Sequence, residues 1–293
     1  MDRIRVRVDD RQLELSNLDK LLYPEFTKGE VIDYYTRVAP VLLPHITNRP
    51  MTRIRYPEGV DAQGFFEKNA PSHTPDWVRT ERLPSPGSST GRDELDYIVV
   101  DDLPTLVWLA NLAALELHVP QWTVGAPPDL LVFDLDPGPP AGLPECFAVA
   151  VDLRAELAAD GIDAYPKTSG RKGMQLLCPI SATQDAEVVS TYARRLADRL
   201  AGREPKRIVS VMRKELRRGK VFIDWSQNNA AKTTVAPYSL RAGTRPRASM
   251  PLHWYEVESG GPVADDPDAV LARIGSDGDL LAPLGQAGPP LPA

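Results

Sequence analysis

The sequence has few of the residues that bind zinc or form disulfides, with only two cysteines and four histidines among 293 residues. Cys146 and Cys178 lie far apart, and no His and Cys residues show the spacing of a zinc site. Such cysteine usage fits a reduced, cytoplasmic protein. No apolar run approaches the length of a membrane span, and the first ten residues, MDRIRVRVDD, have no apolar core. We therefore expect neither a membrane anchor nor a secretion signal.

The sequence also has fewer basic than acidic residues. The chain has 34 Lys and Arg against 40 Asp and Glu, a formal net charge of −6. This balance argues against a globally basic nucleic-acid protein but leaves room for a local basic surface. The densest basic run is RKELRRGK, residues 213–220, in which five cationic side chains accompany one acid. The run is either a solvated face or a local footprint for phosphates.

An apolar strand that ends in two acids is the most informative segment. Residues 130–138 read LLVFDLDPG, and four apolar residues in a row indicate a buried strand. Because side chains alternate between the faces of a strand, Asp134 and Asp136 are expected to point the same way. Paired carboxylates suit Mg²⁺ or Mn²⁺. Two solvated acids at a strand end would give the same pattern.

A second apolar strand also ends in an aspartate. Residues 221–225 read VFIDW and follow directly on the basic run. A third carboxylate, Asp224, at the end of another buried strand is what a two-metal site would recruit. Two metals held in this way bridge the attacking hydroxyl and the phosphate oxygens in phosphoryl transfer.

A small polar turn lies between two predicted strands in TSGRKGMQLLCPI, residues 168–180. Backbone N–H groups, the Ser169 hydroxyl and the Lys172 ammonium could converge there on a phosphate. A β-hairpin with Ser-Gly turn chemistry explains the segment equally well. The spacing is not that of a Walker loop.

Two segments of the N-terminal third allow a structural and a functional interpretation. Lys20 and Lys28 flank a turn before a helix that Thr27 is expected to cap. They are either solvated or form an anion pocket at the helix N-terminus. Phe65 and Phe66 are adjacent in a polar, Gly-bounded segment. Either one ring is buried and the other partly exposed, or an exposed ring offers a base a stacking surface.

Hydrophobic periodicity predicts several helices separated by short strands. Strands are expected at residues 3–8, 51–56, 97–100 and 164–167, and helices at residues 27–42, 106–117, 143–157, 186–200 and 267–274. A lone histidine at a helix end, such as His118, is most often structural. We expect one domain over residues 1–280 and a frayed, Pro-rich tail over residues 281–293.

Five motifs together closely resemble the polymerase domain of bacterial ligase D, in the archaeo-eukaryotic primase superfamily: ELHVPQW, LVFDLDPG, TSGRKG, GKVFIDWSQN and KTTVAPYSLR. The resemblance runs from about residue 15 to about residue 280. It implies an α/β primase-polymerase fold with mixed central β-sheets and an RRM-like catalytic half. It also implies template-directed addition of NTPs or dNTPs, ribonucleotides preferred, to a 3′-OH at gapped or broken DNA during non-homologous end joining.

The resemblance also implies roles for single residues. Asp134, Asp136 and Asp224 would be the catalytic residues that bind two Mg²⁺ or Mn²⁺ ions. The contacts to the incoming nucleotide would be His118, Ser169, Gly170, Lys172, Gln227, Arg241 and Phe66. The contacts to DNA would be Asn17, Lys20, Lys28, Arg55, Phe65 and Phe66, with the first three around the 5′-phosphate of the downstream strand.

The chain departs from the family pattern in two places. Gln175 stands where the family usually has a histidine, and an amide cannot carry charge. The polar loop of residues 82–96 differs from the family's loop that helps to align DNA ends. Because the sequence has no ligase or nuclease region, the chain is either a stand-alone polymerase or an excised domain. Met1 and the Pro-rich tail favour a stand-alone, nucleoid-associated bacterial polymerase, which we expect to work with Ku and a separate DNA ligase. The alternatives are a metal-dependent phosphohydrolase with an Asp nucleophile and a non-catalytic DNA-end-binding module.

Overall fold

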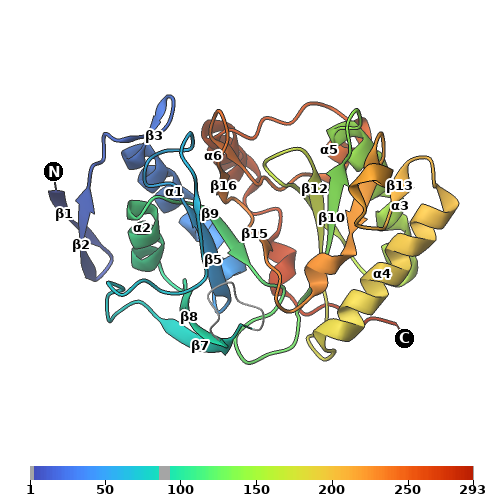
Figure 1. The fold of residues 1–293 in the computed structure, drawn as a ribbon, viewed down its shortest axis with the longest axis horizontal. Coiled ribbons are helices and arrows are strands. Elements are labelled where there is room, and N and C mark those ends of the chain that lie inside the picture. The colour runs from blue at the N-terminus through green and yellow to red at the C-terminus, as the bar shows by residue number, and fades with distance from the viewer. Residues whose placement is uncertain (1–2, 86–92, 293) are drawn as a thin grey trace. The chain divides into compact units, whose positions relative to one another are not determined.

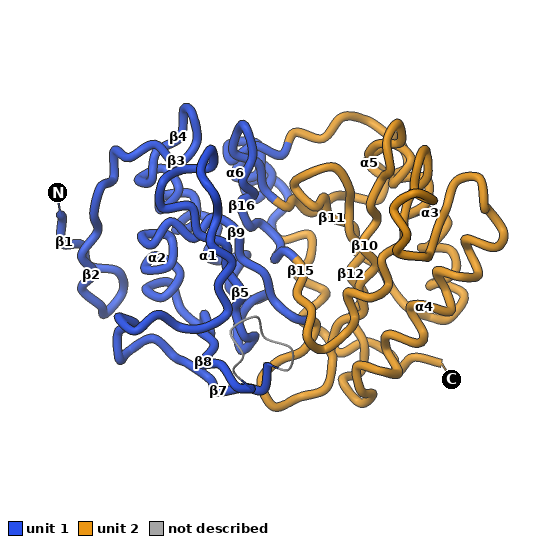
Figure 2. Tube along the Cα trace, viewed as in Figure 1, with its two compact units in different colours: residues 1–120, 235–248, 265–278 blue, residues 121–234, 249–264, 279–293 orange. Residues whose placement is uncertain are grey.

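The computed structural model describes residues 3–85 and 93–292 (Figure 1). The chain folds into two compact units, each assembled from three separate segments (Figure 2). Unit 1 comprises residues 1–120, 235–248 and 265–278, and unit 2 comprises residues 121–234, 249–264 and 279–293. In the described ranges no helix is long and apolar enough to span a membrane.

Unit 1 is built on a six-stranded sheet in the order β15-β9-β5-β8-β7, with β6 also paired to β5. The strands are β5 (Pro50–Arg55), β6 (Phe65–Glu67), β7 (Thr80–Pro84), β8 (Glu94–Val99), β9 (Ala114–Val119) and β15 (Thr234–Val235), of which only the second residue belongs to unit 1. Strand β5 runs antiparallel to β6, β8 and β9. The polar loop predicted over residues 82–96 is shorter than expected, because β7 and β8 include residues 82–84 and 94–96; its residues 86–92 lie outside the described part of the chain.

Helix α1 (Lys28–Ile46) begins where the sequence predicts. The Thr27 hydroxyl accepts from the Glu30 N–H at 3.2 Å, and the Glu30 carboxylate accepts from the Thr27 N–H at 2.6 Å, which completes a capping box. The apolar residues of α1 that recur at helical spacing are all buried: Val31, Tyr34, Tyr35, Val38 and Leu42. The other elements of unit 1 are β1 (Arg3–Val8), β2 (Arg11–Ser16), β3 (Leu21–Tyr23), β4 (Phe26–Thr27), α2 (Leu103–Asn111), β16 (Leu240–Arg241), β17 (Arg247–Ala248) and α6 (Pro267–Asp277).

The helix predicted over residues 106–117 is wrong in its second half. Helix α2 ends at Asn111, and Ala113 takes a positive φ of 57° that a helix does not tolerate. The residues that follow form β9, whose apolar side chains are buried against the sheet of unit 1. A short apolar run fits a buried strand and a buried helix alike. His118 therefore lies on a strand rather than at a helix end.

Unit 2 is built on a five-stranded mixed sheet in the order β11-β12-β10-β14-β13. The strands are β10 (Leu130–Pro137), β11 (Tyr165–Thr168), β12 (Met174–Pro179), β13 (Ile208–Val209) and β14 (Val221–Asp224). Only the β13–β14 pair among them is parallel. The apolar run of residues 130–138 thus forms the central strand, with a neighbour on each side.

Helices α3 (Leu143–Ala159) and α4 (Ala186–Arg203) both contact β10 and confirm the helices expected there. Leu131, Phe133 and Leu135 of β10 are completely buried, and alternation leaves Asp134 and Asp136 on the opposite face. The remaining elements of unit 2 are η1 (Lys214–Arg217), η2 (Trp225–Asn228), α5 (Trp254–Ser259) and η3 (Ala282–Gly285).

The expectation of a frayed C-terminal tail is wrong for the residues that the structure describes. Leu281 and Leu284 pack with Val132 and Leu177 in one buried cluster. Gln184 Nε2 donates to the Leu291 carbonyl at 3.0 Å, and the Leu291 N–H donates back to Gln184 Oε1 at 2.7 Å. The leucines between the prolines anchor this segment. The free energy gained by burying their side chains exceeds the conformational entropy lost when this short stretch of chain is ordered.

Packing of the C-terminal segment can be tested at Gly288, where a Cβ would lie 1.9 Å from the Pro179 carbonyl oxygen. Gly288→Ala should push this segment off β12 and lower stability by about 1–3 kcal/mol, as overpacking does. For a chain of this size the melting temperature should fall by roughly 2–4 °C per kcal/mol, measured by circular dichroism. Gly285→Ala is the matched control, because a Cβ there meets nothing within 4 Å. Equal melting temperatures for the two variants would contradict the packing.

Candidate active site

The three aspartates meet on neighbouring strands of unit 2. Asp134 of β10 pairs directly with Asp224 of β14, and Asp136 pairs with Phe222. Directly opposite residues share a face of an antiparallel sheet, and Asp136 lies two residues beyond Asp134 on that face. The register therefore gathers Asp134, Asp136 and Asp224 at one end of the two strands.

The electrostatics of these carboxylates show that they repel one another. Burial, followed by the charge of Asp136, raises the pKa of Asp134 to about 7. Burial and the charge of Asp224 also raise the pKa of Asp136, while the nearby Arg217 guanidinium lowers it. Each carboxylate therefore makes ionisation of the next less favourable, and a cation among them would relieve this repulsion.

Two carboxylates are held by hydrogen bonds from neutral donors. Gln175 Nε2 donates to Asp134 Oδ1 at 3.0 Å. Asp224 Oδ1 accepts from the Ser226 N–H at 3.0 Å and from Ser226 Oγ at 2.5 Å, and its Oδ2 accepts from Gln227 Nε2 at 3.0 Å. Lys232 Nζ donates in turn to Ser226 Oγ. Gln227, predicted as a nucleotide contact, thus touches a carboxylate directly.

The donor set fits divalent cations in its chemistry. Three carboxylates supply the hard oxygen ligands that Mg²⁺ and Mn²⁺ prefer, and their mutual repulsion favours a bound cation. In residues 3–85 and 93–292 no three His, Cys, Asp or Glu side chains already converge in an arrangement that could hold a metal ion.

The polar turn of residues 169–173 connects β11 to β12 as a hairpin. The Ser169 N–H donates to the Gly173 carbonyl at 3.0 Å. Ser169 Oγ accepts from the N–H groups of Arg171 and Gly173, each at 3.3 Å. Gly170 has a positive φ of 68°, a conformation that favours glycine. The serine hydroxyl therefore organises the turn from within.

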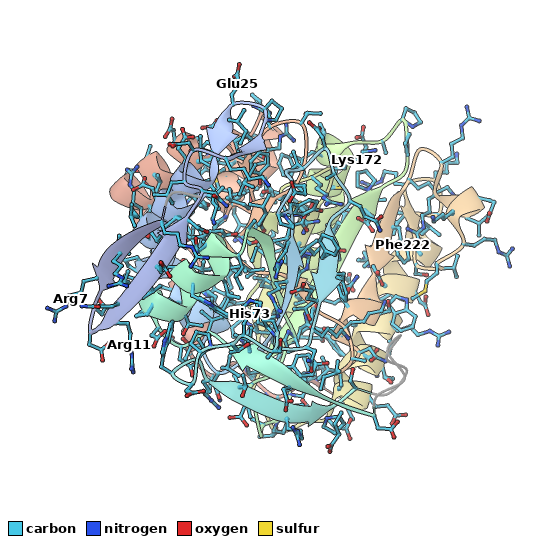
Figure 3. All side chains as sticks on the ribbon, turned by 60° about the vertical axis from the view of Figure 1, so that its left-hand side comes forward. Arg7, Arg11, Glu25, His73, Lys172 and Phe222 are labelled. Carbon is cyan, nitrogen blue, oxygen red and sulfur yellow. The ribbon has the colours of Figure 1, made fainter. Side chains whose placement is uncertain are left out.

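The same turn lies against the aspartate-bearing strand. A Cβ on Gly173 would come within 2.1 Å of the Leu135 carbonyl oxygen, so only glycine allows this approach. Leu135 is the residue between Asp134 and Asp136. Lys172, at the exposed tip of the turn (Figure 3), belongs to the same unit as the three carboxylates.

The basic run also lies beside the end of β10. The Gly138 N–H donates to the Lys220 carbonyl at 2.8 Å, and a Cβ on Gly138 would lie 1.9 Å from the Arg217 carbonyl oxygen. The Arg217 guanidinium lies 3.7 Å from the centroid of the Phe222 ring, and its charge lowers the pKa of Asp136. Positive charge from residues 213–220 is thus built into the surroundings of the carboxylates.

His118 and Arg241, predicted to contact the nucleotide, belong to unit 1 and share a buried acid. His118 Nε2 lies 3.1 Å from Glu116 Oε2, and Arg241 Nε lies 3.5 Å from the same oxygen. The Ala242 N–H donates to Glu116 Oε1 at 3.0 Å. Glu116 was not predicted, because its spacing of two from His118 indicates a shared face only on a strand, and a helix was expected over residues 106–117.

The predicted anion pocket is also in unit 1. Lys28 Nζ donates to the Ser16 carbonyl at 2.5 Å and to Ser16 Oγ at 3.3 Å. Burial, and then the charge of Lys20, lower the pKa of Lys28 to about 8. Lys20 Nζ forms an ion pair with Glu58 at 2.8 Å. Asn17 has a positive φ of 53°, and its carbonyl accepts from the Lys20 N–H at 3.1 Å. Two mutually repelling ammonium groups favour a bound anion.

Phe65 and Phe66 are both exposed on β6, at 53% and 62%. Neither ring is therefore buried in the core, contrary to the structural interpretation. They pair with Arg55 and Ile54 of β5, and Arg55 Nη1 lies 3.6 Å from Glu67 Oε1. Two exposed rings offer stacking surfaces to bases.

Comparison with known proteins identifies the family. A model described as the LigD primase-polymerase domain matches residues 27–281. The multifunctional non-homologous end joining protein LigD of Mycolicibacterium smegmatis is 41% identical over 286 residues, which cover 93% of this chain and 36% of that protein. The bifunctional LigD of Bacillus subtilis is 34% identical over 272 residues, or 91% of this chain and 43% of that protein. The chain thus spans less than half the length of these relatives.

A solved structure described as the polymerase domain of Mycobacterium tuberculosis ligase D in complex with DNA has a TM-score of 0.89 to this chain. The sequence identity is 40%, and the match covers 94% of this chain and 99% of that one. The fold and the matched motifs define a primase-polymerase, a class of nucleotidyltransferase that uses divalent metals. This chain belongs to the family of LigD primase-polymerase domains. The fold class and the enzyme class predicted from the five motifs are confirmed.

The raised pKa of Asp134 predicts that metal binding depends on pH. A metal binds the ionised carboxylate and must displace a proton below the pKa. The Mn²⁺ affinity of the protein should therefore fall as the pH drops from 8 to 6, approaching tenfold per pH unit for each proton displaced. Manganese titrations followed by electron paramagnetic resonance would measure it. Asp198→Asn, on the exposed face of α4, should keep the same profile. A flat profile would contradict the prediction.

Proposed function

We propose that this chain extends a DNA 3′-OH with NTPs or dNTPs on a template at gaps and broken ends. The observation that carries the proposal is the register of β10 and β14, which pairs Asp134 with Asp224 beside Asp136. The relatives are named as non-homologous end joining proteins, and the matching structure is described in complex with DNA. These descriptions support break repair as the setting in which the carboxylates act.

Asp134, Asp136 and Asp224 would hold two Mg²⁺ or Mn²⁺ ions in this proposal. Such ions, when bound, favour the ionised nucleophile and neutralise charge on the phosphates. The chain's own residues position the groups: Ser226 and Gln227 orient Asp224. Lys172 and Arg217 add positive charge in the same unit, where the phosphates of a nucleotide would need it.

The other residues implied by the resemblance keep their proposed roles. His118 and Arg241, joined through Glu116, would contact the incoming nucleotide together with Ser169 and Gly170. The exposed rings of Phe65 and Phe66, with Arg55 beside them, would meet the nucleotide and the template. Because extension leaves a nick, a DNA ligase activity is expected to act next, and Ku is the expected partner that holds the ends.

The pocket formed by Asn17, Lys20 and Lys28 would hold the 5′-phosphate of the downstream strand. The lowered pKa of Lys28 supports an anion site, because a phosphate would restore the charged form of a buried amine. Phosphate contacts fix the register of a protein on DNA without reading sequence. Such an anchor would place the protein at a gap.

Removal of a carboxylate tests the catalytic proposal. Asp134→Ala or Asp224→Ala should reduce primer extension on a gapped duplex more than about a hundredfold. This loss is larger than that expected when a residue that only hydrogen-bonds to a metal ligand is removed. DNA binding should be spared. Extension would be measured with NTPs or dNTPs and with either metal. The matched control is Asp198→Ala, which removes an exposed carboxylate of α4 and should extend normally.

The products of the same assay separate the alternatives. Diphosphate and a longer primer support polymerisation, whereas free phosphate would indicate a phosphohydrolase. DNA binding without either product by the native protein would indicate an end-binding module. Normal extension by both aspartate variants in manganese would contradict the assignment of the carboxylates.

Removal of the two lysines tests the phosphate pocket. Lys20→Ala with Lys28→Ala should abolish the preference for a gapped duplex with a 5′-phosphate, a loss of roughly tenfold or more because charged hydrogen bonds contribute ~1.5–3 kcal/mol. Fluorescence anisotropy on phosphorylated and unphosphorylated duplexes would measure the preference.

The pH dependence of the preference for a 5′-phosphate is a second, independent test of the pocket. Since the pKa of Lys28 is about 8, the native preference should decline above pH 8, where an anion must first recruit a proton. Lys206→Ala removes an exposed lysine of unit 2 and should leave the preference intact. Discrimination that persists in the double variant would place the pocket elsewhere.

A further inference from the structure

A buried lysine in unit 2 has no part in the function proposed so far. Lys167 of β11 is 0% exposed and is among the largest fully buried side chains of the chain. Its Nζ donates to Gln175 Oε1 at 2.6 Å and to Ser249 Oγ at 2.6 Å. A buried ammonium is costly unless its hydrogen bonds are made, so its partners are fixed with it.

The register of the sheet places this lysine in line with the carboxylates. Lys167 of β11 pairs with Gln175 of β12, Gln175 pairs with Asp134 of β10, and Asp134 pairs with Asp224 of β14. These four residues therefore form one row across four adjacent strands. Directly opposite residues share a face, which allows a chain of side-chain contacts along the row.

The lysine determines which way the Gln175 amide points. An ammonium has donors only, so the amide oxygen must face Lys167 and its NH₂ group must face Asp134. Gln175 Nε2 accordingly donates to Asp134 Oδ1 at 3.0 Å. An amide turned the other way would place its oxygen against the carboxylate oxygen and repel it.

Ser249 holds the lysine from the other side. Its Oγ accepts from Lys167 Nζ and donates to the Thr168 carbonyl at 2.7 Å. The Thr168 N–H donates to the Met250 carbonyl at 2.8 Å. The lysine head is thus clamped between β12 and residues 249–250, which leaves it little freedom to release Gln175.

We propose that Lys167 and Gln175 are positioning residues that orient Asp134 for a divalent cation, an inference that rests on the proposed metal site. Lys167 fixes the amide, and the amide engages Oδ1 of Asp134 while Oδ2 stays available to the cation. Partners behind a metal ligand commonly set its orientation and tune affinity. Gln175 thereby does with an amide N–H what the family's usual histidine could do with a ring N–H.

The test is the Mn²⁺ affinity of the full chain without nucleotide or DNA, measured by electron paramagnetic resonance. Lys167→Met and Gln175→Leu, close in size to the native residues, should each weaken Mn²⁺ binding roughly tenfold or more. Gln175→His should bind Mn²⁺ nearly as the native protein does, because a neutral imidazole accepts from Lys167 and donates to Asp134. This rescue is a result that a merely structural role would not produce.

Leu177→Val controls for loss of stability, since Leu177 is buried on the same strand two residues from Gln175. It should lower the melting temperature and leave Mn²⁺ affinity unchanged. Native affinity in folded Lys167→Met and Gln175→Leu proteins would overturn the inference while leaving the metal site intact. Native affinity in Asp134→Ala would instead remove the proposed metal site and this inference with it. Should Lys167→Met fail to fold, the contrast between Gln175→Leu and Gln175→His decides.

Discussion

Mutual repulsion among three carboxylates at the ends of two antiparallel strands is the constraint on which the rest of unit 2 depends. Burial and the charges of neighbouring carboxylates raise the pKa values of Asp134 and Asp136. Neighbouring groups reduce this repulsion. Gln175, Ser226 and Gln227 donate hydrogen bonds to the carboxylates, and Arg217 places a positive charge near Asp136. A sheet built for stability alone would not gather like charges, so the cluster is best understood as a functional feature.

The sequence predicted the structure best where a feature depends only on residues close together in the chain. Period-two alternation placed Asp134 and Asp136 on one face, and Thr27 as the expected cap located the start of α1. The length of α2 was overestimated because a buried apolar run has no period that separates strand from helix. The C-terminal segment was misjudged because its prolines suggested disorder, whereas its leucines determine its packing.

The supporting residues could not be predicted, because they come from distant parts of the chain. Nothing in the order of residues pairs Lys167 with Ser249, or Glu116 with Arg241, since both contacts depend on strand register and on late segments. Ser226 was missed for a different reason. It lies two residues after Asp224, but only the turn of η2 brings its hydroxyl back to that carboxylate.

The interleaving of the two units has a consequence for how the polypeptide matures. The segments alternate between the units, so the chain crosses from one to the other five times (Figure 2). Strands β10, β11, β12 and β14 all emerge from the ribosome before Ser249, the first residue after the third crossing. A nascent chain thus contains all three aspartates of the cluster before it contains the Ser249 hydroxyl that accepts a hydrogen bond from Lys167. The contact that holds Lys167 in place can therefore form only late in synthesis, after the strands that carry the three aspartates.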